Sequence, residues 1–64
     1  MDDDAIELVA QLCTRIGIIM EDASVIALTE PGLQRDARRA AIGEIGLAAR
    51  QISALVAAAE ALLV

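Results

Sequence analysis

The sequence predicts an all-α protein, a two-helix antiparallel hairpin that pairs into a homodimeric four-helix bundle. Helix-forming residues fill both halves of the 64-residue chain, one Pro-Gly turn separates them, and apolar residues recur at heptad spacing. A domain this short buries only about 60% of the surface that its unfolded chain exposes, so it needs a further source of stability. The single cysteine, Cys13, cannot close an intrachain disulfide. We therefore expect a homo-oligomer, with a dimer as the favoured state.

The bounds of the two helices follow from composition and from one turn. We expect a single hairpin domain over residues 1–64, made of a helix over about 3–28, a turn over 29–32 and a helix over 33–63. In the turn, Thr29 and Pro31 suit the start of the second helix. Asp2 to Asp4 suit the positive end of the first helix, where one of them serves as N-cap.

Two segments leave the helical pattern open to alternatives. The segment Glu21-Asp22-Ala23-Ser24 predicts either an unbroken first helix or a break at which Ser24 caps a new one. Gly43 and Gly46 lie inside the second helix, where each glycine costs roughly 1 kcal/mol relative to alanine. These glycines indicate either a kink over residues 43–46 or a place where two helix backbones come close.

Apolar residues occupy three adjacent heptad rows on each helix, which is the wide face of a bundle helix and not the narrow seam of a two-stranded coil. The predicted core has these members: Val9, Leu12, Ile16, Ile19, Met20 and Ile26 against Ile42, Ile45, Ala48, Ile52, Leu55 and Val56. Cys13 belongs to one of these rows and is expected to be a small core residue. The alternatives for Cys13 are an intermolecular disulfide and a reactive thiol.

Other apolar residues lie roughly opposite the main face of each helix, and a lone hairpin would leave them in water. They indicate a further interface, for which the predicted residues are Ile18, Val25, Leu33 and Leu47, with Gly43 and Gly46 as the points of close approach. The occupant of this interface is either a symmetric copy or a partner's helix.

The composition argues against most enzymes and against nucleic-acid binding. Histidine, lysine and all aromatic residues are absent, and ten acids against five arginines give a net charge of −5. General acid–base catalysis therefore lacks its commonest groups, and a phosphate backbone would be repelled with no aromatic ring on which to stack a base. The absence of histidine and the lone cysteine also predict no metal and no cofactor.

The charges are unevenly divided between the two halves of the chain. Up to Gly32 there are seven acids and one arginine, and from Leu33 onward there are three acids and four arginines. Arg35, Arg38 and Arg39 begin the second helix, close to the acids at the end of the first, so solvated ion pairs are expected. The alternative is an anion site at this helix N-terminus, which the nearby Asp36 weakens.

The location of the protein is expected to be cytoplasmic, without a membrane span. The opening Met1-Asp2-Asp3-Asp4 differs from a secretory signal, and charged residues interrupt both apolar stretches, Glu21 and Asp22 in the first and Arg50 and Glu60 in the second. In size and layout the hairpin resembles the small dimeric four-helix bundle proteins that regulate plasmid copy number. This resemblance concerns architecture only, because no motif of their RNA-binding face is present.

These observations predict a small non-enzymatic module for oligomerisation or protein interaction, as a regulator or an accessory subunit. One alternative is a binder of a small apolar ligand in the bundle core, since alanine-rich helices without aromatic residues favour a cavity between subunits. The other alternative is anion or nucleic-acid binding through Arg35, Arg38 and Arg39.

Overall fold

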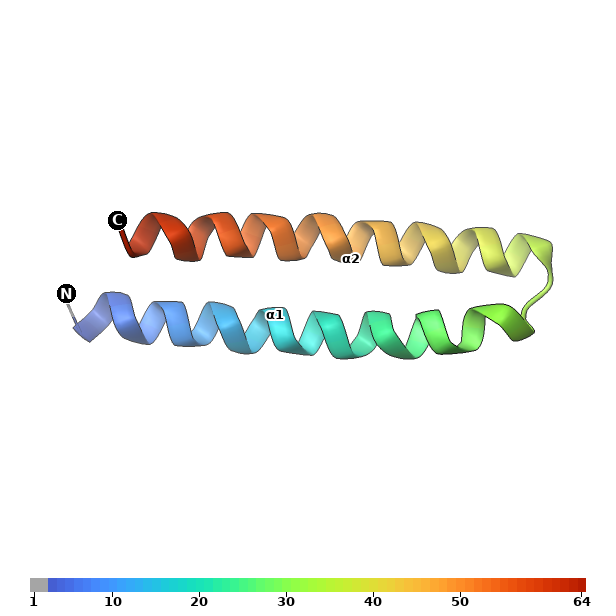
Figure 1. Ribbon diagram of the computed structural model, residues 1–64, viewed down its shortest axis with the longest axis horizontal. Helices are drawn as coiled ribbons and strands as arrows, with labels where there is room; N and C mark the ends of the chain where they lie inside the picture. Colours follow the sequence, from blue (N-terminus) through green and yellow to red (C-terminus); the bar gives the residue numbers. More distant parts are fainter. Residues whose placement is uncertain (1–2) are drawn as a thin grey trace.

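The computed structural model describes residues 3–64 and shows a helical hairpin (Figure 1). Helix α1 spans Asp3–Thr29, a short 3-10 helix η1 spans Glu30–Gly32, and helix α2 spans Arg35–Leu62. The two long helices lie side by side and antiparallel, so the start of α1 and the end of α2 lie at one end of the hairpin and the turn lies at the other. The fold over these residues is therefore all-α, as the sequence predicts.

Both helices run without interruption through the two segments for which the sequence leaves alternatives. The segment 21–24 is helical within α1, and Gly43 and Gly46 are helical within α2. Neither glycine has a positive φ, and a Cβ atom added at Gly43 would meet nothing within 4 Å. The hairpin itself therefore gives no reason for glycine at position 43. The alternative of a break at 21–24 is wrong, because α1 is continuous over Asp3–Thr29.

The turn differs from its prediction in the role of Thr29. The Thr29 hydroxyl does not cap α2: it donates backward to the carbonyl oxygens of Val25 and Ile26, at 3.2 and 3.0 Å, and so belongs to the last turn of α1. Pro31 lies in η1, before α2. Leu33 and Gln34 are extended, and α2 begins only at Arg35, where Gln34 is the N-cap without a side-chain hydrogen bond. Proline and threonine thus end one helix and do not start the next.

The helices meet along a narrow apolar seam. Its residues alternate at spacings of four and three on each helix, which keeps one line of side chains facing the partner helix. The seam consists of Ala5, Val9, Leu12, Ile16, Ile19, Ala23 and Ile26 on α1, with Glu30 of η1 at its turn end, and of Ala41, Ile45, Ala48, Ile52, Leu55, Ala59 and Leu62 on α2. Ala41 is the one buried residue among those described, at 6% exposure, and the other seam residues are half-buried.

The predicted core is therefore too wide for the hairpin alone. Met20, Ile42 and Val56 were expected in it, yet all three are exposed, and Cys13 is exposed as well. The reason is geometric: two helices can cover only the rows that face each other, and the adjacent row on each helix lies beyond the contact. The wide face is present in the sequence, but a single hairpin leaves its outer part uncovered.

Helix α2 also has the length and hydropathy of a membrane span. It is 28 residues long, and its most apolar 18-residue window has a mean hydropathy of 1.4. Such a window allows up to two charged residues, whereas the expectation of no membrane span rests on Arg50 and Glu60, which interrupt the apolar stretch of α2. That the chain stays out of the membrane remains a prediction.

Candidate interaction surface

One side of the hairpin is an apolar face, which we call the flank. Its residues each follow a seam residue and stand seven apart: Ile6, Cys13, Met20 and Ala27 on α1, Ile42, Ala49 and Val56 on α2, and Leu63 directly after α2. The charged Arg35 begins the same row of α2 at the turn end. In an antiparallel pair of right-handed helices, residues at this heptad position lie on the same side of the seam. All of them are exposed, with Met20 at 53% and Ile42 at 59%.

The other side of the hairpin confirms this assignment. Arg15 and Gln51 each precede a seam residue, and both line one surface depression together with Ile19, Ala54 and Leu55. Residues that precede the seam therefore meet on one side, so residues that follow it lie on the opposite side. We call this second side the polar side, because its central rows contain Arg15, Asp22, Glu44 and Gln51.

The row that borders the flank on each helix has small residues at its middle and charged residues toward its ends. This row, which we call the rim, contains Asp3, Ala10, Gly17 and Ser24 on α1, and Arg39, Gly46, Ser53 and Glu60 on α2. A Cβ atom at Gly17 would meet nothing within 4 Å, and one at Gly46 would meet only Arg50 Nη1 at 3.6 Å. Another backbone can therefore approach the flank closely over the middle of both helices.

The predicted interface residues do not form one face. Ile18, Val25 and Leu47 are exposed, and helical spacing places them toward the outer edges of the polar side. The charged central rows lie between the α1 residues and Leu47. Gly43 lies on the outer surface of α2, and Gly46 belongs to the rim of the flank. The signal for the flank was present in the sequence, but it was assigned to the core of the hairpin.

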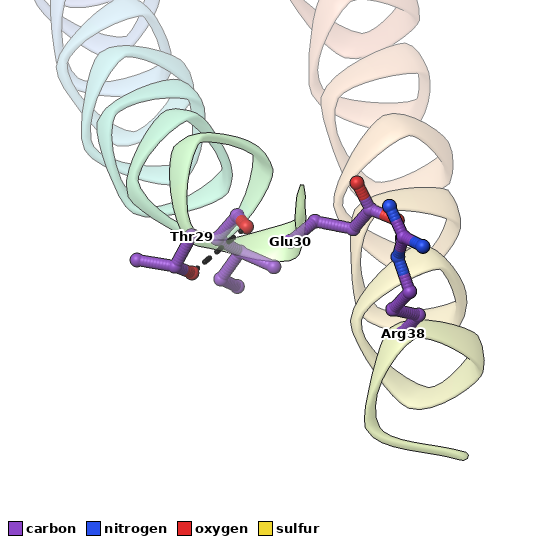
Figure 2. A network of polar contacts seen from close by, with 4 residues as sticks. Thr29, Glu30 and Arg38 are labelled. Atoms are coloured by element: carbon purple, nitrogen blue, oxygen red, sulfur yellow. Dashed lines mark hydrogen bonds and ion pairs between the residues drawn. The ribbon is translucent and has the colours of Figure 1, made fainter. Parts of the chain in front are cut away.

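The arginine cluster of Arg35, Arg38 and Arg39 lies at the turn, and Arg38 forms an ion pair there. Arg38 Nε donates to Glu30 Oε1 at 2.8 Å, and Figure 2 shows these two side chains meeting beside the turn. The pair is partly exposed, with 46% of the Arg38 side chain and 23% of the Glu30 side chain accessible. Of the expected ion pairs, this one forms. Binding of an anion by Arg35, Arg38 and Arg39 remains a prediction, in which Arg38 would have to leave Glu30.

Two surface depressions of the hairpin are open to solvent. One depression is lined by Asp4, Glu7, Leu8 and Gln11, all from α1, and the other lies on the polar side. Within residues 3–64 no group of three or more cysteine, aspartate or glutamate side chains is placed to hold a metal ion. The feature that stands out is therefore the flank.

The chain matches no protein-family model, and no curated protein and no solved structure is significantly similar to it.

Proposed function

We propose that the protein is a non-enzymatic helical association module, and that its flank binds a second copy of the same chain to form a homodimeric four-helix bundle. The observation that carries the proposal is an apolar face along both helices, exposed throughout, whose rows contain no charged residue apart from Arg35 at the turn end. A contiguous apolar face of this kind indicates a protein interaction site. In this role the molecule serves as a small regulator or accessory subunit.

The surface area of the hairpin supports a partner of its own size. The hairpin exposes 4830 Å², whereas a folded monomer of 6.7 kDa exposes about 3,900 Å² by the usual scaling of area with mass. The excess of roughly 900 Å² is close to the 800 Å² or so that each partner buries in a standard interface. The Cα atoms extend over only 49 × 15 × 10 Å, so a second hairpin would double the thinnest dimension.

A second copy also explains the residues that the hairpin leaves unexplained. Met20, Ile42 and Val56 would enter the bundle core that the sequence predicts, and the rim glycines would face a neighbouring backbone. Because the flank occupies the same rows on both copies, a two-fold axis brings the face against itself, as in most homodimers.

The test compares two substitutions on one helix. Met20 lies on the flank and Ile18 on the polar side, and their exposures in the hairpin are nearly equal, 53% and 50%. We expect the wild type and Ile18→Glu to sediment as dimers, and Met20→Glu as a monomer with reduced helicity, because only the flank would bury the new carboxylate. If Ile18→Glu dissociates while Met20→Glu stays dimeric, the interface lies on the polar side. If the wild type instead sediments with phosphatidylcholine vesicles and forms no dimer in solution, that result would also contradict the proposal.

A further inference from the structure

The two ends of the hairpin differ in charge. At the end where α1 begins and α2 ends, the charged residues that the structure describes are all acidic: Asp3, Asp4, Glu7 and Glu60. At the turn end, Arg35, Arg38 and Arg39 offset the acids around them. The way in which two flanks meet decides whether the two acidic ends lie together or apart. This distinction rests on the homodimer proposed above and adds the direction in which its two copies pair.

A symmetric dimer that pairs flank against flank has two possible arrangements. If the two-fold axis runs along the helices, both turns lie at one end, and α1 of one copy lies over α2 of the other. If the axis runs across the helices, the turns lie at opposite ends, and each helix lies antiparallel over its own counterpart. The first arrangement gathers the acidic ends of both copies, and the second separates them by most of the 49 Å length of the hairpin.

The rim of α2 is complementary to itself when it is reversed. At seven-residue intervals it contains a cation, two small residues and an anion: Arg39, Gly46, Ser53 and Glu60. Against an antiparallel copy of the same row, Arg39 faces Glu60 and Gly46 faces Ser53. In the other arrangement Glu60 lies over the first turns of α1, where Asp3 and Glu7 repel it.

We propose that two copies pair with their turns at opposite ends, with the α2 rim of one copy antiparallel to the α2 rim of the other. Arg39 of each copy then faces Glu60 of the second copy, and the contact forms twice in every dimer. Because these residues lie at the edge of the flank, they set the direction of pairing, and the apolar rows provide the affinity.

Charge reversal on the rim tests the contact. Arg39→Glu and Glu60→Arg each place like charges opposite one another at two positions, so each variant should raise the dimer dissociation constant about tenfold. The double variant should restore it, and a mixture of the two single variants should form the heterodimer in preference to either homodimer. Both substitutions suit the helix dipole, an acid near the start of α2 and a base near its end, so weaker pairing cannot be assigned to helix loss.

The direction is measured by the distance between spin labels. Gln34→Cys in a Cys13→Ala background places one label per copy at the turn, on an exposed residue. Pairing with turns apart predicts a separation of roughly 45 Å, from the 1.5 Å rise per helical residue. Pairing with turns together predicts less than about 25 Å, the width of a four-helix bundle with its labels.

The outcomes separate this inference from the proposed function. A long distance with preferential heterodimers supports both. A dimer with a short distance overturns the direction of pairing and leaves the association module intact. A protein without dipolar coupling at any concentration, and monomeric by sedimentation, overturns both.

Discussion

The flank and the polar side are formed by the same two helices, but they differ in the residues that they expose. On the flank, the central rows contain only apolar residues and cysteine apart from Arg35 at the turn end, whereas on the polar side the equivalent rows contain Arg15, Asp22, Glu44 and Gln51. Exposed apolar residues occur on both sides, so their number does not distinguish the sides. The difference is continuity: charges separate the apolar residues on one side, and none does on the other. The interaction surface that we propose is therefore distinguished by the absence of charged residues between its apolar residues.

The largest effect should come from the seam, because it supports both sides. Ile16→Asp or Ile45→Asp places a carboxylate between the helices, and we expect a loss of about 3 kcal/mol or more, enough to unfold the assembly. Circular dichroism and thermal melting measure it. Gln11→Asp, at the exposed outer edge of the polar side, is the control and should keep its helicity. A folded Ile16→Asp/Ile45→Asp double variant with unchanged thermal stability would refute the seam.

The glycines provide a sharper comparison between the flank and the surface away from it. Gly17 and Gly43 both have open space at the Cβ position in the hairpin, so alanine at either should stabilise its helix by about 1 kcal/mol. Gly17 lies on the rim, where the second copy would crowd the added methyl group. We expect Gly43→Ala to raise the melting temperature by about 4–8 °C, and Gly17→Ala to raise it less.

The measurement for both glycine variants is thermal melting at low and high protein concentration. If the second copy is responsible, the difference between Gly17→Ala and Gly43→Ala grows with concentration, because only the dimer contains the contact. Equal gains at every concentration would show that the rim is not a place of close approach.

The smallest effect is expected at the turn, which belongs to neither side. Glu30→Gln removes the partner of Arg38, a partly exposed pair that contributes at most about 1 kcal/mol and less in salt. Urea unfolding of Glu30→Gln, Arg38→Gln and the double variant gives the coupling between the two residues. We expect a coupling of a few tenths of a kcal/mol that vanishes at high salt. A coupling that resists salt would mean that the pair is buried in the assembly.

Heptad spacing predicts the fold but not the partner of each row. Ile16 and Ile45 were placed in the contact between the helices, and both lie in the seam. Met20 and Val56 belong to the adjacent row with the same apolar character, and nothing in the spacing tells whether the hairpin or a second chain covers that row. The sequence therefore predicts which residues avoid water, while the structure divides them between the seam and the flank.

The turn was misjudged for a different physical reason. Thr29 has the residue type of an N-cap, but its hydroxyl can also donate to carbonyl oxygens three and four residues earlier, and here it does so. The choice between these bonds depends on the path of the chain through Leu33 and Gln34, which are extended. Residue type alone does not determine that path. The sequence therefore predicts a start of the second helix at about residue 33, whereas α2 begins at Arg35.

The central claim is that folding and self-association are one event. Sedimentation of the wild type over a dilution series, with circular dichroism on the same samples, tests it most directly. With one buried residue among those described, the hairpin has little core of its own, so we predict a helical dimer that loses helicity as it dissociates. A monomer that keeps its full helicity at the lowest concentration would contradict the claim.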